Sequence, residues 1–561
     1  MGLSPIRGRA RPPYLPKTFH VMFGRTTTLI ALALALALPA SAPARQARSS
    51  KAPTGLKAFL LRYNEPASHY FSRTPSFGWK SFPKATSYDF QLATSSRFRE
   101  NSILWSASGL TLPGTSVPLA LPWVTGNPYS LFARVRARLQ YGTTPWSKDF
   151  GLSVRWTEVP AELPAPNGLL RWTPIDGATS YEVWAVDVHG VGTRSWTKTH
   201  FVATNVTDMR DWFTFHSDAG WVGTAFWRVR AVRATYGTST NSETTTSYGR
   251  WSPVFTKHAT PPNAATVALN GTFSDTVGTI AEPSAHALMP GFSWSGVSDG
   301  SGTDLYRAYV FSDDKCVDPV LTGSIVGSPA WVPRSSGALV LPTSVDDLAK
   351  TLSGELLPKD GDQADTLDRS GHVLAANESA SATARLDLWD RKWPSGAYYW
   401  TAVRVNWYID TETKTVKYFD AEMPQDACAA GRIGTFGKVS PPILTDGKNA
   451  YITGLSQTGR MTSSPVSRSH RVWGTPLVTW MPVMGAGGYE VQLSHIRNPF
   501  EPVGSSIVTP VTSVVLSPAP GTWYYRVRGL NLHMPGGAQG MDWSSVRKMR
   551  IGRPSFRVVK K

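Results

Sequence analysis

One order of aromatic residues recurs four times along this chain, and a recurring unit constrains the fold more than any single motif. Each unit opens with a Trp, and a Tyr follows after nine residues in three units and after twelve in the other. A short alternating run of polar and apolar residues follows each Tyr, as expected of a half-buried β-strand. The sequence therefore predicts four tandem domains that are mostly β. The core pairs we expect are Trp79 and Tyr88, Trp172 and Tyr181, Trp294 and Tyr306, and Trp480 and Tyr489.

Two further landmarks follow in the same order within the units. Three units carry an Arg-x-Arg pair inside a β-like run, and the same three units close with Trp-Ser. The third unit has the variant run 399–405 and closes with Phe436-Gly437. The residues are Arg134, Arg136 and Trp146 in the first unit, Arg228, Arg230 and Trp251 in the second, and Arg526, Arg528 and Trp543 in the fourth.

This order of landmarks resembles the fibronectin type III domain, and the resemblance covers roughly residues 60–555. It implies an all-β fold of four tandem fibronectin type III-like (immunoglobulin-like) sandwiches, each of about 100 residues and seven short strands. Pro-rich joints between the units predict extended, semi-rigid spacing. The repeats we expect are 58–157, 158–260, 261–444 and 445–561, the last of which begins with a linker.

The paired arginines admit two interpretations. Alternate residues of a strand share a face, so Arg134 and Arg136 lie on one face and Val135 on the other. In the cytokine-receptor sandwiches, a related domain type, such arginines stack on the Trp of the last strand. By this resemblance we favour a structural Arg–Trp stack in all three units. A stripe that binds phosphate or RNA is the second interpretation.

The N-terminus has the features of an export signal. Residues 29–38 form an apolar core too short to span a bilayer, and Ala42-Pro43-Ala44 offers a cleavage site. We therefore expect 1–44 to be a signal peptide with a long basic leader, and translation to start at Met1 or Met22. The signal resembles those of high-GC bacteria, especially actinobacteria. We expect a secreted protein without a membrane span after cleavage, or one held at the cell surface without a covalent anchor.

The chain is strongly basic. Its formal net charge is +18, and cleavage after Ala44 removes five basic residues and no acid, which leaves +13. A basic exported protein tends to associate with anionic surfaces, so the partners we expect are a protein or an anionic cell-wall polymer. Nucleic acid has charge alone in its favour, and we do not expect it as a partner.

The third unit departs from the others through an insertion. Residues 299–426 hold 20 Asp and Glu against 12 Lys and Arg, and the insertion over about 342–388 carries much of this acidity. The run 343–352 predicts a short helix with an apolar stripe of Val345, Leu348, Ala349 and Leu352 and a capping box of Ser344 and Asp347. Whether this helix covers a sandwich edge or binds a partner stays open. A carboxylate-rich loop follows at Asp360, Asp362, Asp365 and Asp368. It does not follow the ligand order of a known calcium loop, so we favour a solvated loop over a calcium site.

Both cysteines of the chain, Cys316 and Cys428, fall in the third unit. In an exported protein a single pair is normally oxidised, so we predict a structural disulfide between them. Such a bond closes a long loop and is expected to stabilise the repeat by about 4–5 kcal/mol.

The sequence contains no Gly-x-Ser-x-Gly elbow, no His-Glu-x-x-His motif, no Gly-rich phosphate loop and no cysteine pair at zinc spacing. We therefore expect no catalytic residue, no metal site, no cofactor and no enzymatic activity. No pattern identifies the ligand-binding residues.

The function we expect is that of a non-catalytic extracellular or cell-surface binding or adhesion protein that presents tandem sandwiches to its partner. A carbohydrate-binding module array is one alternative, because flat aromatic rings stack on sugars in a polysaccharide. A passive structural spacer is another. The carbohydrate alternative requires Tyr63, Tyr70, Phe71, Trp331, Trp389 and Trp393 to line one exposed face.

Overall fold

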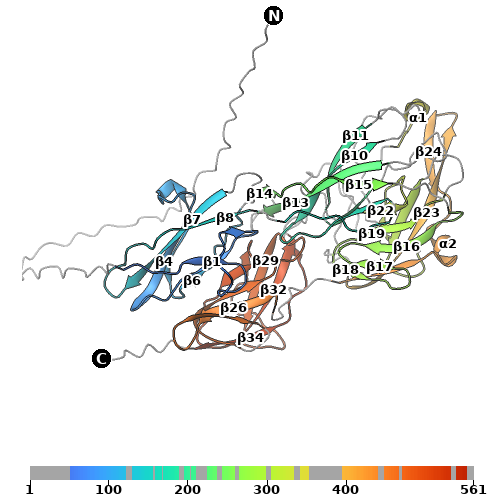
Figure 1. Cartoon of the computed structure of the whole chain (residues 1–561). Helices are drawn as coiled ribbons and strands as arrows, with labels where there is room; N and C mark the ends of the chain where they lie inside the picture. The colour runs from blue at the N-terminus through green and yellow to red at the C-terminus, as the bar shows by residue number, and fades with distance from the viewer. Residues whose placement is uncertain are drawn as a thin grey trace, which may run out of the picture. The chain divides into compact units, whose positions relative to one another are not determined.

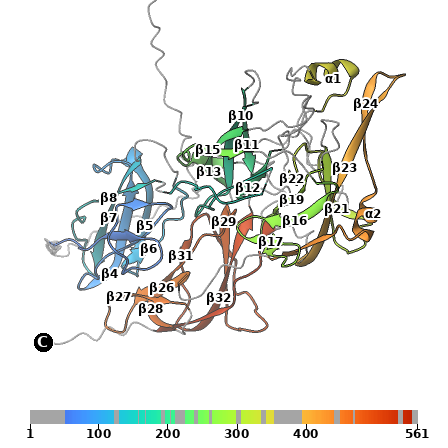
Figure 2. The same cartoon turned by 45° about the vertical axis from the view of Figure 1, so that its right-hand side comes forward.

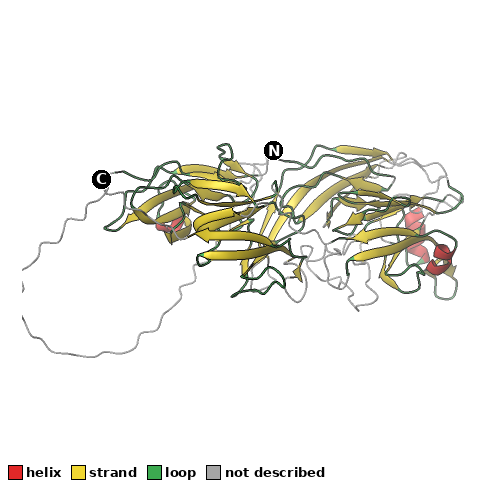
Figure 3. Ribbon diagram, turned by 90° about the horizontal axis from the view of Figure 1, so that it is seen from below, coloured by secondary structure: helices red, strands yellow, loops and turns green. Residues whose placement is uncertain are grey.

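The computed structural model describes residues 51–121, 129–155, 158–166, 168–188, 195–202, 204–209, 224–236, 243–258, 264–297, 305–333, 341–352, 394–439, 448–466, 470–531 and 539–552. The predicted signal peptide over 1–44 and the acidic loop with Asp360, Asp362, Asp365 and Asp368 lie outside these ranges. Strands dominate the described residues, and helices are few and short (Figure 3). The predicted all-β fold class is confirmed.

The first repeat is a sandwich of two sheets. Its strands are β1 (Lys57–Phe59), β2 (Tyr70–Phe71), β3 (Ser76–Gly78), β4 (Ala85–Ala93), β5 (Ile103–Leu110), β6 (Gly114–Thr115), β7 (Tyr129–Leu139) and β8 (Phe150–Val154), with a 3-10 turn η1 (Glu100–Ser102) before β5. One sheet has the strand order β1-β3-β6 and the other β2-β8-β7-β4-β5. Figure 1 shows these strands in blue and cyan. All neighbours are antiparallel except β2 and β8, which run parallel.

The second repeat has the same two-sheet plan. Its strands are β9 (Leu169–Arg171), β10 (Ser180–Val188), β11 (Ser195–Val202), β12 (Val206–Asp208), β13 (Thr224–Tyr236), β14 (Glu243–Tyr248) and β15 (Phe255–His258). The smaller sheet pairs β12 with β9, and the larger has the order β11-β10-β13-β14 with β15 on β13.

The third repeat carries the additions. Its strands are β16 (Ala268–Phe273), β17 (Val277–Thr279), β18 (Ala285–His286), β19 (Gly291–Ser295), β20 (Tyr306–Phe311), β21 (Pro319–Thr322), β22 (Ala330–Trp331), β23 (Gly396–Asp410), β24 (Thr415–Asp420) and β25 (Gly434–Lys438), with helices α1 (Val345–Leu352) and α2 (Pro424–Ala429). The sheets have the orders β17-β16-β19-β22 and β18-β25-β23-β20-β21, and β24 pairs with β23. The hairpin of β23 and β24 and the two helices that contact it are seen in Figure 2.

The fourth repeat forms one continuous sheet that folds over on itself. Its strands are β26 (Ala450–Leu455), β27 (Met461–Pro465), β28 (His470–Trp480), β29 (Gly488–Ser494), β30 (Ile507–Thr509), β31 (Ser513–Val515), β32 (Gly521–Asn531), β33 (Gln539–Gly540) and β34 (Arg547–Gly552). The order is β27-β26-β28-β34-β32-β29-β30, with β31 on β28 and β33 on β32. Strand β28 joins the two layers, because its first half pairs with β34 and its second half with β26 and β31.

Helix α1 occupies the predicted helical run. Its N-terminus has the expected cap, since the backbone N–H of Asp347 donates to Oγ of Ser344 over 3.1 Å. Leu348 is buried against Val405 and Val416 of the hairpin, whereas Ala349, which the predicted apolar stripe included, is exposed. The helix therefore covers the hairpin along a narrower stripe than the sequence indicates.

Each repeat buries its signature Trp and Tyr in edge-to-face contact, with ring centroids 5.4–5.6 Å apart. The Tyr hydroxyl has the same role in all four repeats. It accepts the backbone N–H of a residue in the turn between the Trp and the Tyr, namely Phe82, Ile175, Val297 and Val483 in chain order, over 2.8–3.2 Å. This bond satisfies a polar group that the core would otherwise bury unpaired, which explains why Tyr rather than Phe occupies the position.

The repeats contact one another within the compact unit Ala47–Lys561. Phe59 and Leu112 of the first repeat share a buried cluster with Leu477 of the fourth. Beside this cluster, the backbone N–H of Tyr63 donates to Oγ of Ser463 over 2.6 Å. The extended spacing predicted from the Pro-rich joints is therefore wrong here, because apolar side chains of the two repeats pack together and a hydrogen bond joins residues 400 positions apart.

The second and third repeats are also joined. Leu169 lies in a buried cluster with Ala330. The guanidinium of Arg171 donates through Nε to the carbonyl of Ser274 over 2.6 Å. A charge-assisted hydrogen bond of this kind is stronger than one between neutral groups, so it helps to hold the two repeats together.

Candidate functional site

The predicted arginines of the first repeat lie against aromatic rings. The guanidinium carbons of Arg134 and Arg136 lie 4.4 and 4.6 Å from the ring centroid of Trp146. Arg134 also lies 4.1 Å from the ring centroid of Phe98. These distances are within the range of cation–π contacts.

The edges of these two guanidiniums, and that of Arg138, bond to polar residues of the neighbouring strand β4. Nε of Arg136 and Nε of Arg138 donate to the two carboxylate oxygens of Asp89 over 2.9 and 2.6 Å. Burial alone would raise the pKa of Asp89, but the hydrogen bonds from the two arginines outweigh it and hold this pKa below its ordinary value. Gln91 accepts both Nε and Nη2 of Arg134.

The second and fourth repeats have the same arrangement. In the second, the ring contacts run Trp184, Arg228, Trp251, Arg230, Tyr248, with distances of 4.3–4.7 Å. In the fourth they run Phe500, Arg526, Trp543, Arg528, with distances of 4.2–4.4 Å. Glu182 pairs with Arg230, and Glu490 pairs with Arg528. Sequence reasoning missed the carboxylates, although an acid directly follows the signature Tyr in all three repeats.

The Ser of each Trp-Ser pair explains why the Trp lies where it does. In the first repeat, Ser147 donates its backbone N–H to the carbonyl of Val135, and its Oγ accepts the N–H of Val135 over 3.1 Å. Ser252 bonds in this way to Val229, and Ser544 to Val527. The backbone N–H and the hydroxyl of the Ser thus take the place of a pair of backbone hydrogen bonds just before the last strand. They hold the preceding Trp over the arginines.

In the third repeat, helix α2 covers the sheet face that carries the stacked arginines in the other repeats. Strand pairing places Val403 opposite Arg307, where the other repeats place an Arg opposite an acid. Val403 is buried in a cluster with Phe311 and both cysteines. Cys316 and Cys428 form a disulfide, as predicted, and it fixes helix α2 over this face.

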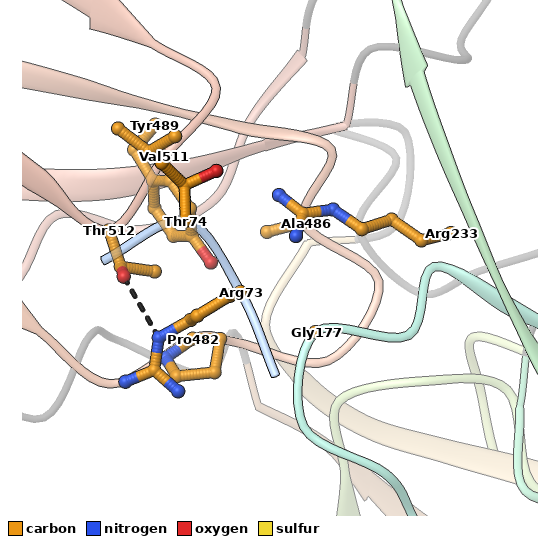
Figure 4. Close-up of a pocket in the computed structure, with 9 residues that line it drawn as sticks. All are labelled: Arg73, Thr74, Gly177, Arg233, Pro482, Ala486, Tyr489, Val511 and Thr512. Carbon is orange, nitrogen blue, oxygen red and sulfur yellow. Dashed lines mark hydrogen bonds between the residues drawn. The ribbon is translucent and has the colours of Figure 1, made fainter. Parts of the chain in front are cut away.

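The first, second and fourth repeats meet at a small cavity of about 10 Å³, which is room for a single water molecule (Figure 4). Arg73 donates through Nε to Oγ1 of Thr512 over 3.1 Å and lies 3.8 Å from a carboxylate oxygen of Asp176. Arg233 reaches the cavity from the second repeat, and Tyr489 from the fourth. Burial lowers the pKa of both arginines, and that of Arg233 falls to about 10, so Arg233 remains cationic at neutral pH.

An open groove of about 640 Å³ lies at one end of the first sandwich. Three segments line it: 51–56 before β1, 80–83 between β3 and β4, and 147–150 leading into β8. Its lining includes Lys51, Lys80 and Lys148 against the single acid Asp149. Apolar side chains complete the lining, and we call them the apolar floor of the groove: Leu56, Phe82, Phe150, Pro53 and Pro83. Its volume is typical of sites that bind small ligands.

The aromatic residues on which the carbohydrate alternative depends do not form one exposed face. Trp331 is fully buried in the core of the third repeat, and Phe71 is buried in the first. Tyr70 is about half exposed, at 51%. Trp389 and Trp393 lie outside the described residues.

Within the described ranges, no group of three or more His, Cys, Asp and Glu side chains is placed to hold a metal ion. One hydroxyl–imidazole contact resembles a catalytic pair, since Oγ of Ser274 lies 2.7 Å from Nδ1 of His286. His286 is fully buried, however, so no substrate reaches it. Of the helices in the described part of the chain, none is long and apolar enough to cross a membrane.

No family model matches this sequence, and no curated protein matches it. Among solved structures, the chain is similar to the crystal structure of selenomethionine-substituted chicken interferon gamma receptor alpha chain. The two are 8% identical, with a TM-score of 0.16, over 38% of this chain and 100% of the receptor chain. A likeness this weak carries no information about ligands.

Proposed function

We propose that this chain is a secreted, non-catalytic binding protein that attaches to an anionic component of a cell surface. The observation that carries the proposal is the open groove of the first repeat, which brings three lysines and one acid together on an apolar floor. The net charge of +13 that remains after removal of residues 1–44 favours the same class of partner.

The sheet faces that carry the paired arginines are already covered, which favours a binding role for the loops at the ends of the sandwiches. In three repeats the arginine face is occupied by its own aromatic rings and carboxylates, and in the third repeat α2 covers it. We infer that the paired arginines stabilise the sandwiches rather than bind phosphate. The resemblance to fibronectin type III domains also favours a binding protein over an enzyme, although fold alone does not fix function.

The test is binding of residues 45–561 to intact cells, purified cell wall and insoluble neutral polysaccharide, at low salt and with 0.5 M salt added. We expect binding to cells and wall that added salt abolishes, because exposed charge pairs are screened within about 10 Å at 0.1 M salt. Salt-resistant binding to the neutral polysaccharide would instead support a carbohydrate-binding module. Binding to no surface at all would contradict the proposal and leave a spacer role.

A further inference from the structure

The groove of the first repeat has a preformed shape. Its first two walls are joined where the backbone N–H of Lys80 donates to the carbonyl of Thr54 over 3.0 Å. The Lys80 stem crosses Gly55, where a Cβ would lie 3.0 Å from Cγ of the lysine. Gly55 has φ of +72°, a conformation that side chains disfavour, so a Gly at this position lets the lysine lie along the wall.

The third wall and the floor are fixed as firmly. Ser147 is hydrogen-bonded in both directions to Val135 of β7, which holds the segment that carries Lys148. The ring of Phe150 stacks on His69, with centroids 4.9 Å apart and planes 21° from parallel. A site held in this way loses little entropy when a ligand binds.

We propose that this groove binds an anionic polysaccharide, with lysine ammonium groups on the carboxylates of uronate sugars and the apolar floor against the sugar rings. The inference rests on the proposed function and assigns its binding site and ligand class. Two features of the lining favour this class. The lysines supply point charges for anionic groups, and the half-buried rings of Phe82 and Phe150 in the lining suit the C–H faces of a sugar ring. A bare phosphodiester chain would use the lysines and leave the floor without a partner.

The test compares two double variants of residues 45–561 that lose the same charge. K80Q/K148Q removes two exposed lysines of the groove, and K315Q/K417Q removes two exposed lysines of the third repeat. The probe is a defined oligogalacturonate, titrated by calorimetry at 50 mM salt. We expect at least tenfold weaker binding by K80Q/K148Q and less than twofold change for K315Q/K417Q. Equal weakening by both variants would overturn the site, because the attraction would then be spread over the surface.

A second arm tests the ligand class. The variant F150L removes the flat ring and keeps an apolar side chain, and inorganic polyphosphate replaces the sugar polymer as the anion. We expect F150L to weaken binding of oligogalacturonate severalfold and to leave binding of polyphosphate unchanged. Equal loss for both anions, or tighter binding of polyphosphate by the unmodified protein, would overturn the sugar assignment.

The outcomes separate this inference from the proposed function. If the unmodified protein binds cell wall and K80Q/K148Q binds it equally well, the groove assignment fails and the proposed function stands. If the unmodified protein binds no surface, the proposed function fails. Far-ultraviolet circular dichroism confirms beforehand that every variant is folded.

Discussion

Acidification should weaken the third repeat through one buried histidine. His286 is fully buried in β18, which pairs with β25, and its ring nitrogens contact three hydroxyls. Nε2 lies 2.9 Å from Oγ1 of Thr272, and Nδ1 lies 2.7 Å from Oγ of Ser274. Burial lowers the pKa of His286 and the nearby Arg171 lowers it as well, whereas Asp275 partly offsets them, and the resulting pKa is about 4.

The sign and size of the change in the free energy of unfolding follow from proton linkage. Unfolded His286 takes up a proton near pH 6.5, whereas the folded residue does so only near the lowered pKa of about 4. Between these values the unfolded state binds more protons, so the free energy of unfolding falls as the pH falls. At 1.36 kcal/mol per pKa unit, the loss reaches about 3 kcal/mol near pH 4 and is absent above about pH 7.

Hydrogen exchange with mass spectrometry measures this loss locally, after correction for the intrinsic pH dependence of exchange. Peptides from β16 to β19 should lose protection between pH 6.5 and 4 in the unmodified protein, and a His286→Gln variant should lack this pH-dependent step. Peptides from the fourth repeat serve as the control in the same sample. Equal pH dependence of the 264–297 peptides in both proteins would refute the reasoning.

Three further predictions concern stability. Replacing Cys316 and Cys428 by Ala opens a loop of 112 residues and should lower the stability of the third repeat by about 4–5 kcal/mol, measured by hydrogen exchange of β20 and β23; unchanged protection would contradict this. The substitution Trp146→Leu removes two arginine contacts and should destabilise the first repeat by about 1–2 kcal/mol in urea unfolding, whereas the exposed Tyr141→Leu should change it little. Leu477→Ala empties the buried cluster between the first and fourth repeats at a cost of about 2–5 kcal/mol, and it should raise exchange in β1 as well as in β28; an effect confined to β28 would show that the two repeats are not coupled.

The cores were predictable because they depend on local pattern. A strand alternates its side chains between two faces, so Trp172 and Tyr181 with the apolar alternation after them indicate a buried face without knowledge of any partner strand. The helix α1 was predictable for the same reason, since Ser344 and Asp347 set its start within four residues.

The contacts between repeats were not predictable from such patterns. Tyr63 meets Ser463 through a backbone N–H, which every residue but Pro possesses, so the sequence contains no signal for this pairing. The groove depends on the positive φ of Gly55 and on three loops that meet in space, and neither feature produces a regular pattern in the sequence. The pairing of Asp89 was predictable only in part. Asp89 directly follows the signature Tyr, but its two arginine partners lie on a strand that starts some 40 residues later.

The sheet face that carries the paired arginines is covered in one of two ways in each sandwich, and this restricts where on the sandwich a ligand can bind. In the first, second and fourth repeats, the paired arginines of this face contact aromatic rings. Five of these six arginines also bond to polar residues at their edges, so their guanidiniums are largely engaged within the repeat. In the third repeat the same face has Val403 in place of an Arg, and an exposed apolar face would favour aggregation unless α2 and the disulfide covered it. Both solutions close the broad face of the sheet. We therefore expect recognition by these sandwiches to use the loops at their ends, where backbone geometry rather than strand alternation decides which side chains meet, and the groove of the first repeat is such a place.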